Sequence, residues 1–395
     1  MRVYADNAAT TKMSETAIKA MDDAIQNYWG NPSSLHSIGQ SAAEALQKAR
    51  EDIAEVLGCT AREIYFTSGG SEADNQAIIS AARIGAKKGK KHIISTAFEH
   101  HAVLHTLKKL EKEGFEVELL DVSKNANITP EQVKNAIRDN TCLVTVMFAN
   151  NEIGSILPIA EIGAICREKG ILFHTDAVQA AGHLHINVAE QNIDMLSLSA
   201  HKFHGPKGVG VLYAKKGMPL TVLIEGGAQE RGKRAGTENL PAIISMAAAL
   251  KEADANLDVN AARMSRLRDK LIDGLSKIEH SALNGTRENR LPGNVNFIFE
   301  GIEGESLLLL LDDRGICASS GSACTSGSLD PSHVLLAIGR PHEIAHGSLR
   351  LSLSEWTTEE EIDYMLEQIP VVVKYLRNMS PLWREKINSE KQFVL

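Results

Sequence analysis

The sequence has few cysteines, no long hydrophobic run and no concentrated stretch of basic charge. Its five cysteines are scattered without a C-x-x-C pair, which argues against a disulfide framework and against a thiolate zinc site. The longest apolar run, Leu307 to Leu311, is too short to span a bilayer, and the first residues lack the apolar core of a signal peptide. We therefore expect a cytoplasmic protein without membrane contact.

The charge is weakly acidic, with 50 acidic against 42 basic residues and a net charge of −8. Because the basic residues are dispersed, no nucleic-acid surface is expected, and small molecules or proteins are the favoured partners. No internal repeat is found. The length of 395 residues exceeds the roughly 100 to 200 residues of a typical domain, which favours two domains.

Helical and strand-like patterns alternate through the first two thirds of the chain. Apolar runs of strand length include KHIIST, CLVTVMF, GILFHT, DMLSLS and GVGVLYA, and several are too uniformly apolar to have a solvated face. Between them lie helical patterns, one ended by Gly58 and another opened by a capping box of Thr129 and Gln132. The alternation predicts an α/β fold whose parallel sheet is covered by helices on both sides.

The pattern changes after about Leu250, where a charged helical stretch leads to a strand-like run and a Gly/Ser-rich segment around Cys324. A long amphipathic helix follows a capping box of Thr358 and Glu361. We expect a large domain over residues 15–257 and a smaller α+β domain made of residues 1–14 and 258–395.

Two segments directly after predicted strands carry polar groups suited to ligand binding. Residues beyond the carboxyl ends of parallel strands line the usual ligand crevice of an open α/β sheet. Asp176 follows GILFHT, where its carboxylate could meet a cationic ring nitrogen, although aspartate is also a common helix cap. Gly69, Gly70 and Ser71 lie between a strand and a helix, an arrangement that serves as an anion cradle or as a plain turn.

Lys202 follows the apolar run DMLSLS, between two histidines and before a Pro/Gly-rich turn. A lysine beside a sheet edge of low polarity is expected to have a lowered pKa, which makes its amine available for a Schiff base. A phosphate cradle, a rim carboxylate and a rim lysine are together the requirements of pyridoxal phosphate. The combination indicates this cofactor more strongly than any of the three does alone.

Two further features bear on the chemistry. His101 and His105 have the i, i+4 spacing of a metal-binding pair, but no carboxylate or thiol in the segment completes a ligand set, and we expect His100 to stack on the cofactor ring instead. Cys324 lies in SSGSACTSGS, which contains no large apolar side chain to hold it in a core. A thiol on such a segment, which we expect to be mobile, suits a nucleophile that must travel.

These residues belong to a longer series of motifs that resembles the NifS-type cysteine desulfurases of the class V aminotransferase superfamily. The similarity runs almost end to end and includes YADNAATT, GNPSSLHSIG, FTSGGSEADN, ANNEIG, HTDAVQAAG, SLSAHKFHGPKGVG, GGAQERGKRAGTEN, RLPGNVN, ASSGSACTSGSLDPSHVL and HGSLRLSLSEWTTEEEID. The resemblance implies a pyridoxal-phosphate transferase of fold type I with a mainly parallel seven-stranded sheet. It also implies conversion of L-cysteine to L-alanine, with the sulfur left as a persulfide on an enzyme cysteine and supplied to iron–sulfur cluster assembly.

The resemblance further implies how the cofactor is held. Lys202 corresponds to the Schiff-base lysine that later shuttles protons, and Asp176 to the partner of the pyridinium nitrogen. His100 corresponds to the stacking imidazole and Gln179 to the donor to the phenolic oxygen. The remaining cofactor contacts implied are Gly70, Ser71, Ser199 and His201 on the phosphate side, Asn151, and Thr237 from the neighbouring subunit, which implies a homodimer.

The resemblance also assigns the substrate and sulfur sites. Asn151 and Arg350 correspond to the groups that hold the substrate carboxylate, a task suited to the guanidinium fork. Cys324 corresponds to the persulfide carrier, and the other four cysteines are interpreted as structural. No stable metal site is expected, although Cys324 could transiently contact a cluster on an iron–sulfur scaffold protein. Residues 380–395 resemble tails that engage such a scaffold, or else form a frayed end.

Three alternatives remain at this point. Another superfamily member, such as an aminotransferase or a selenocysteine lyase, would not need Cys324. A non-catalytic scaffold of the same fold would not need Lys202, Asp176 and Cys324 together. A zinc hydrolase would need metal ligands that the sequence does not place together.

Overall fold

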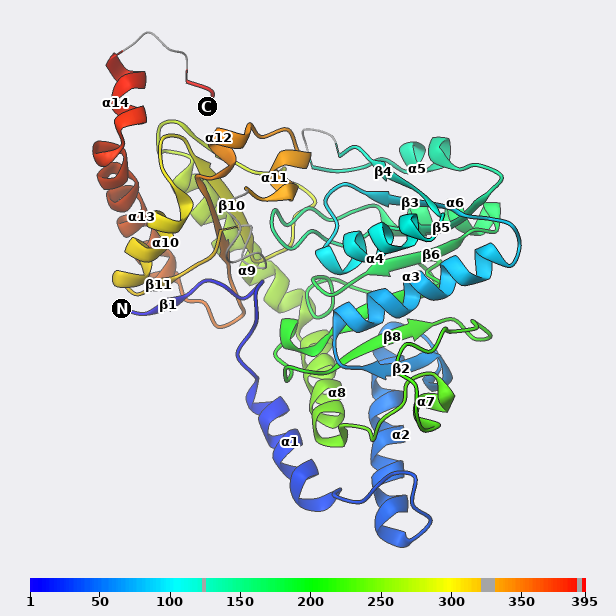
Figure 1. The fold of residues 1–395 in the computed structure, drawn as a ribbon. Helices are drawn as coiled ribbons and strands as arrows, with labels where there is room; N and C mark the ends of the chain where they lie inside the picture. Colours follow the sequence, from blue (N-terminus) through cyan, green and yellow to red (C-terminus); the bar gives the residue numbers. More distant parts are fainter. Residues whose placement is uncertain (123–125, 321–330, 389–392) are drawn as a thin grey trace.

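The computed structural model describes residues 1–122, 126–320, 331–388 and 393–395. Its centre is a seven-stranded sheet in the order β2-β8-β7-β6-β5-β3-β4, shown with its helices in Figure 1. This confirms the predicted α/β class with a mainly parallel sheet. The strands are β2 (Ile64–Thr67), β3 (His92–Thr96), β4 (Glu116–Leu120), β5 (Thr141–Thr145), β6 (Leu172–Asp176), β7 (Met195–Ser199) and β8 (Gly210–Ala214).

Strand β8 departs from the all-parallel reading of the apolar runs, because it pairs antiparallel with both β7 and β2. Only Ala200 to Val209 connect β7 to β8, and this connection contains one short 3-10 turn, η2 (Ala200–Lys202). A parallel neighbour needs a crossover of a dozen or more residues, usually with a helix. The short link therefore forces the chain to return in the opposite direction.

Both faces of the sheet are buried by helices, as the apolar strands predicted. Neighbouring residues of a strand point to opposite faces, and Leu143 and Val144 of β5 accordingly lie in two different hydrophobic clusters. One face is covered by α3 (Gly70–Ala86) and α4 (His101–Lys112). The other packs against α2 (Ser37–Leu57), α5 (Pro130–Ala136), α6 (Ile159–Lys169) and α8 (Leu240–Ala255), and α1 (Glu15–Asn27) packs on α8.

A separate hydrophobic cluster surrounds an antiparallel sheet in the order β12-β10-β9. The cluster includes Val3 and Ala5 from the start of the chain, because β1 (Val3–Tyr4) pairs in parallel with β11 (Ile316–Cys317). The division at residues 14 and 257 stays a prediction. The remaining elements are α7 (Gln229–Gly232), α9 (Leu257–Leu275), β9 (Ser281–Leu283), β10 (Asn294–Phe299), α10 (Gly304–Asp313), α11 (His333–Ala337), α12 (His342–Ala345), β12 (Ser348–Ser352), α13 (Glu359–Met379), α14 (Pro381–Asn388) and the 3-10 turn η1 (Ala61–Glu63).

The predicted helix ends are confirmed. Gly58 caps α2 in the left-handed region at φ 68°, and capping boxes open α5 at Thr129 and α13 at Thr358. None of the helices in the described ranges is long and apolar enough to cross a membrane.

Candidate active site

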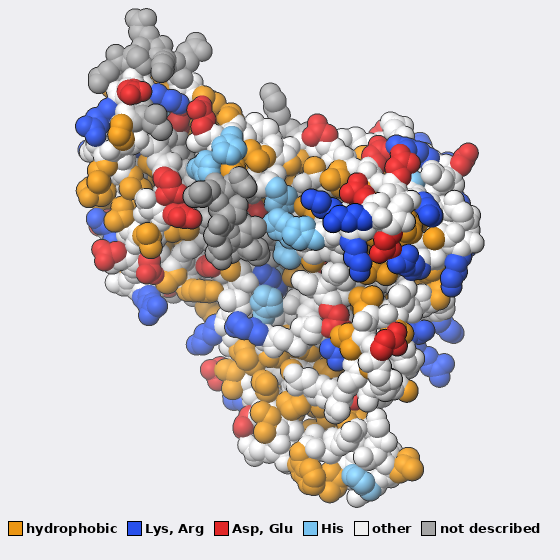
Figure 2. Space-filling view, viewed as in Figure 1, with side chains coloured by type: hydrophobic (Ala, Val, Ile, Leu, Met, Phe, Trp, Pro, Cys, Tyr) orange, Lys and Arg blue, Asp and Glu red, His pale blue; other side chains and the backbone are white. Residues whose placement is uncertain are grey.

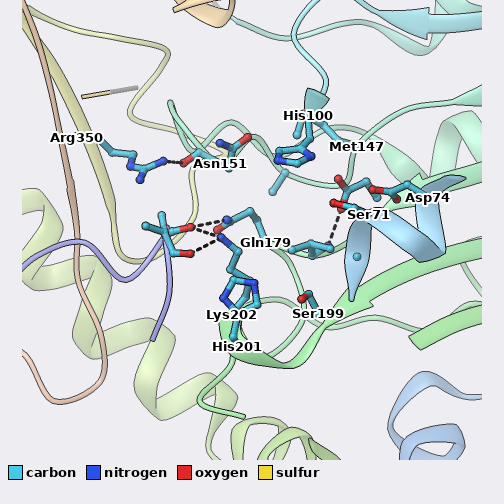
Figure 3. Close-up of a pocket in the computed structure, with 16 residues that line it drawn as sticks. Ser71, Asp74, His100, Met147, Asn151, Gln179, Ser199, His201, Lys202 and Arg350 are labelled. Atoms are coloured by element: carbon cyan, nitrogen blue, oxygen red, sulfur yellow. Dashed lines mark hydrogen bonds between the residues drawn. The ribbon is translucent and has the colours of Figure 1, made fainter. Parts of the chain in front are cut away.

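A cavity of about 280 Å³ lies at the carboxyl edge of the large sheet. Strands β6 and β7 end there at Asp176 and Ser199, and α3 begins there at Gly70. Figure 3 shows the side chains of this cavity pointing toward a common space. Its lining residues are Ala8, Ala9, Gly70, Ser71, Asp74, His100, Met147, Ala149, Asn151, Asp176, Val178, Gln179, Ser199, His201, Lys202 and Arg350. The fold thus brings together the predicted site residues except Thr237 and Cys324.

Lys202 lies in the turn that directly follows β7. Its Nζ donates hydrogen bonds to the carbonyl oxygens of Ala8 at 2.6 Å and Ala9 at 2.8 Å. Gln179 Nε2 donates to the same Ala8 oxygen at 3.0 Å. The N-terminal segment therefore forms one wall of the cavity, a role that sequence reasoning missed.

Asp176 is buried at the end of β6, and its Oδ1 accepts from the backbone N–H of Val178 at 2.9 Å. Burial, opposed by that N–H and by the Lys202 charge, raises the pKa of Asp176 to about 6. A buried carboxylate at this point is a suitable partner for a cationic ring nitrogen, since pairing would compensate its lost hydration.

Asp74 is a second buried carboxyl in the cavity, and sequence reasoning missed it. It is 1% exposed, its Oδ1 has no hydrogen-bond partner among the described residues, and burial together with Asp176 raises its pKa well above the usual range. One ligand atom from each of Asp74, His100 and Asp176 lies within 4.8 Å of the others. Asp74 comes four residues after Gly70 on α3, and this spacing places both on one helix face.

His100 is the histidine that lines the cavity. It caps α4, where its Nδ1 accepts from the backbone N–H of Ala102 at 3.1 Å. Burial, together with the charge of Lys202, lowers the pKa of His100 to about 4, so the ring is neutral at pH 7. The neighbouring His101 does not line the cavity, and its ring contacts His105 and His333 instead.

The phosphate-side candidates lie around the start of α3. Gly70 and Ser71 form its first turn, where unpaired backbone N–H groups and the helix dipole favour an anion. Ser199 faces this turn, since a Cβ placed on Gly69 would lie 3.7 Å from its Oγ. The ring of His201 contacts Thr10 Oγ1 at 3.1 Å, and burial with the Lys202 charge lowers its pKa to about 4.

Arg350 enters the cavity from β12, on the side opposite Ser71 and Asp74 of α3 (Figure 3). Its guanidinium donates to the Asn151 carbonyl oxygen at 3.1 Å and to Asp6 Oδ1 at 3.0 Å. The Nε of Arg350 is buried and has no hydrogen-bond partner in the part of the chain described here. A buried guanidinium with an unused donor is suited to an incoming carboxylate.

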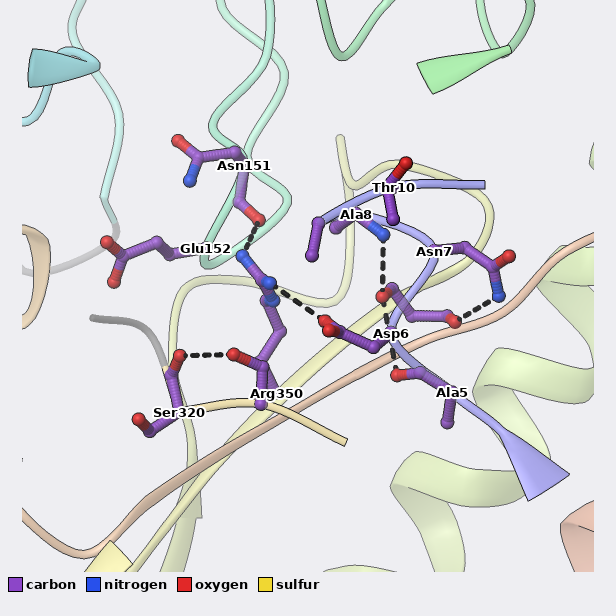
Figure 4. Close-up of polar contacts among 12 residues, drawn as sticks. Ala5, Asp6, Asn7, Ala8, Thr10, Asn151, Glu152, Ser320 and Arg350 are labelled. Atoms are coloured by element: carbon purple, nitrogen blue, oxygen red, sulfur yellow. Dashed lines mark hydrogen bonds and ion pairs between the residues drawn. The ribbon is translucent and has the colours of Figure 1, made fainter. Parts of the chain in front are cut away.

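Two predicted residues lie elsewhere. Thr237 is exposed between α7 and α8 and does not line the cavity. Cys324 lies outside the described residues. The segment that leads to it is held at the site, because Ser319 and Arg350 exchange two backbone hydrogen bonds of 3.2 and 2.6 Å. Figure 4 shows the neighbouring Ser320 beside Arg350.

The other four cysteines are free thiols, and three of them are poor nucleophiles. Burial raises the pKa of Cys59 and Cys166 to about 12 and that of Cys142 to about 11, so almost no thiolate forms at pH 7.

The chain belongs to the class-V aminotransferase family, whose model matches residues 3–365. It is 53% identical to "Cysteine desulfurase IscS" of Clostridium botulinum over 99% of both chains, and 54% identical to the Methanosarcina thermophila protein of that name over 96% of this chain and 94% of the relative. Among solved structures, a "NifS-like protein" has a TM-score of 0.89 and 39% identity, with 95% of this chain and all of that chain covered.

The family membership makes the chain an enzyme that depends on pyridoxal 5′-phosphate. The cavity fits this group: it offers an amine at Lys202, a buried carboxylate at Asp176 and a helix N-terminus at Gly70. These are the aldehyde, ring-nitrogen and phosphate partners that the cofactor requires.

Proposed function

We propose that the chain is a cysteine desulfurase, which converts L-cysteine to L-alanine and transfers the sulfur to Cys324. The observation that carries this proposal is one cavity lined by the Lys202 amine, the buried Asp176 carboxyl and the Arg350 guanidinium. The names of the most similar relatives agree with it.

The cofactor, when bound, supplies an electron sink for the bonds at the substrate α-carbon. We assign Lys202 as its covalent attachment point and Asp176 as the group that keeps its ring nitrogen protonated. Gln179 and neutral His100 would contact the ring, while Gly70, Ser71, Ser199 and His201 would hold the phosphate. The Lys202 amine would also be the base that moves the α-proton of the substrate, a role that needs a position within hydrogen-bond reach of that proton.

Arg350 and Asn151 orient the substrate through its carboxylate. The Arg350 guanidinium contacts the Asn151 carbonyl oxygen, so the two residues lie together at one end of the cavity. The Nε of Arg350 is still unpaired among the described residues and could donate to the carboxylate. A carboxylate bound there leaves the amino end of the substrate directed toward Lys202, across the cavity. Holding the substrate in this orientation lowers the entropy cost of bringing the reacting groups together.

Cys324 accepts the sulfur. It is the fifth residue after Ser319, which is tied to the Arg350 backbone, and five extended residues span at most about 18 Å. The thiol is thus tethered within reach of a substrate held by Arg350. Its thiolate attacks the substrate sulfur and forms a sulfur–sulfur bond. The carbon–sulfur bond breaks, and the electron pair of that bond passes to the β-carbon, which takes up a proton to give alanine.

The proposal also covers the assembly of the protein, its location in the cell and its sulfur acceptor. We propose a homodimer in which Thr237 reaches the phosphate of the neighbouring subunit, a cytoplasmic location, and an iron–sulfur scaffold protein as sulfur acceptor. Thr237 is exposed and does not line the cavity of its own chain, which supports the proposed homodimer.

The test is the Cys324→Ala variant. It should bind the cofactor and cysteine as the wild type does, because both are held by other residues, while alanine release falls by orders of magnitude. Cofactor absorbance with and without cysteine and alanine assays measure the two effects, with Cys142→Ala as the matched control. Alanine release at the wild-type rate would instead indicate a lyase, such as a selenocysteine lyase, that needs no enzyme thiol.

A further inference from the structure

Asp74 is a buried carboxyl in the cofactor cavity to which the proposed reaction gives no task. It lies in the second turn of α3, and Figure 3 shows it on the side of the cavity opposite Arg350. One carboxyl oxygen of Asp74 lies within 4.8 Å of one of Asp176. We propose that Asp74 is a positioning residue for the cofactor's ring nitrogen, because it donates a hydrogen bond to Asp176 and fixes the direction of that carboxylate. The inference rests on the role that the proposed function gives to Asp176.

The first support is the short distance between two buried carboxyls. Both side chains are almost completely removed from solvent. Two carboxylates that share such a site do not both ionise, because their charges repel each other and neither is hydrated. The pair therefore keeps one proton, and the question is which carboxyl carries it.

The second support is the distribution of hydrogen-bond donors around the pair. Asp176 Oδ1 accepts from the backbone N–H of Val178 at 2.9 Å, and the charge of Lys202 also favours its ionised form. Asp74 Oδ1, in contrast, has no hydrogen-bond partner among the described residues. An ionised carboxylate in that position would be costly, whereas a protonated one has an O–H to donate. The donors thus assign the charge to Asp176 and the proton to Asp74.

The third support is that His174, the other group beside Asp74, supplies no alternative partner. Its Nε2 lies 3.6 Å from Asp74 Oδ1, beyond hydrogen-bond distance. Both ring nitrogens are already engaged, Nδ1 with Thr145 Oγ1 at 2.8 Å and Nε2 with Ser197 Oγ at 3.0 Å. Burial lowers the pKa of His174 to about 3, so the ring is neutral at pH 7 and offers no positive charge to Asp74.

His100 is the third group near the pair, and it is not an acceptor. Its Nδ1 accepts from the backbone N–H of Ala102 and the ring is neutral at pH 7, so Nε2 carries the proton. The Asp176 carboxylate is therefore the acceptor that the cavity offers to the O–H of Asp74. The Cβ–Cγ bond of an aspartate is a soft torsion, and its rotation can shorten the distance between the two oxygens.

The consequence for the enzyme is a fixed direction of the Asp176 carboxylate. The cofactor ring draws electrons from the substrate while its nitrogen is protonated, and an acidic partner aimed at that nitrogen maintains this state. A carboxylate held on one side only by the Val178 N–H can still turn. A second hydrogen bond from Asp74 would lock it, as supporting residues around an active site do for the groups that touch the ligand.

The experiment titrates cofactor-free enzyme with pyridoxal 5′-phosphate and with its deaza analogue, in which C–H replaces the ring nitrogen. Asp74→Leu has no donor and should lower the affinity for pyridoxal phosphate by about 10- to 100-fold, the range for a hydrogen bond to a charged group. Its effect on the analogue should be much smaller, since the analogue has no nitrogen for Asp176 to face. Asp74→Asn, whose amide can also donate, should keep most of the wild-type affinity.

A spectroscopic measurement separates positioning from a loss of packing. Solid-state NMR of the bound cofactor, labelled with nitrogen-15 in its ring, reports whether the ring nitrogen is protonated. The resonance should have the protonated value in the wild type and in Asp74→Asn, and it should move toward the neutral value in Asp74→Leu. A defect of packing alone would weaken binding without moving this resonance.

Two further variants serve as controls. Ser80→Ala removes a buried hydroxyl of α3 that does not line the cavity, and it should change neither the affinities nor the resonance. Asp176→Ala should lose more affinity for pyridoxal phosphate than for the deaza analogue, because it removes the partner of the ring nitrogen itself.

The outcomes distinguish the possible failures. A loss in Asp176→Ala without a loss in Asp74→Leu overturns the role of Asp74 alone, and a loss in neither also overturns the assignment of Asp176. Equal losses of both cofactors in Asp74→Leu would mean that Asp74 only shapes the cavity, and a loss in Asp74→Asn as large as in Asp74→Leu would make Asp74 an ionised partner. Either result overturns the proposal, while sulfur transfer is tested separately by Cys324→Ala.

Discussion

At the scale of single residues, the cavity holds two buried carboxyls, Asp74 and Asp176, together with the Lys202 amine. Asp176 and Lys202 follow apolar runs, so their position at the sheet edge could be predicted. Asp74 lies within a helix, and only the packing of α3 against β6 and β7 brings its carboxyl toward Asp176. The Ala8 carbonyl reaches Lys202 across 194 residues, which no local pattern can indicate.

The Asp74–Asp176 pair predicts a pH-dependent stability of the cofactor-free protein. The pKa of Asp74 is raised above its ordinary value of 3.8, so the folded state binds a proton that the unfolded state has released. The contribution of Asp74 to the free energy of unfolding is therefore fully present below about pH 4, and it is lost as the pH rises from there through the folded pKa. Asp74→Asn resembles the neutral carboxyl in shape and lacks this loss. Its stability advantage over the wild type should therefore grow with pH, by at most about 1.4 kcal/mol per pH unit, until the pH passes the folded pKa of Asp74.

Chemical unfolding of both proteins between pH 5 and about 8 measures this difference. The Glu55→Gln variant, which changes an exposed carboxylate, is the control and should show a small difference that does not grow with pH. A constant gap between Asp74→Asn and the wild type would show that Asp74 is ionised in the folded protein.

At the scale of elements, apolar periodicity predicted the buried strands and the capped helices, but it failed where a strand is partly solvated. β4 has the mixed pattern Glu116, Val117, Glu118, Leu119, Leu120 at the sheet edge, and the apolar runs did not reveal it. The direction of β8 depended on the length of a connection rather than on any residue pattern.

One buried ion pair joins two elements that no sequence pattern connects. Arg50 of α2 and Glu230 of α7 form two hydrogen bonds of 2.8 and 2.6 Å, and Glu230 also accepts the backbone N–H of Phe66. Glu230 has a φ of 47°, an uncommon value for a residue other than glycine. The pair thereby holds the segment that continues to Thr237.

We expect Glu230→Ala to destabilise the protein by about 3 to 5 kcal/mol, because Arg50 would keep a buried charge without a partner. Arg50→Met combined with Glu230→Leu should recover most of this loss, since no charge remains buried. Denaturant unfolding of Arg50→Met, of Glu230→Leu and of the variant that combines them gives the coupling energy. Equal losses in Glu230→Ala and in the double variant would mean that side-chain packing, rather than charge, sets the cost.

At the scale of the whole molecule, large apolar side chains are exposed at the surface of the chain. Trp29 is 70% exposed and Leu35 93%, and both lie between α1 and α2, where Figure 2 shows hydrophobic side chains at the surface. Exposed apolar groups of this size are typical of protein interfaces. Thr237 is likewise exposed, although it follows a segment that the buried Arg50–Glu230 pair holds in place.

A mixing experiment tests whether Thr237 acts on the partner's site. Lys202→Ala and Thr237→Ala homodimers should both be impaired, the first in chemistry and the second in cofactor affinity. In a mixed dimer, the site with an intact Lys202 receives Thr237 from the Lys202→Ala chain, so half of the sites should regain wild-type cofactor affinity. If Thr237 served its own chain, that site would keep the Thr237→Ala defect and mixing would restore nothing. Cofactor titration of dimers purified with two different tags, with the wild type mixed with Lys202→Ala as the matched control, distinguishes the two arrangements.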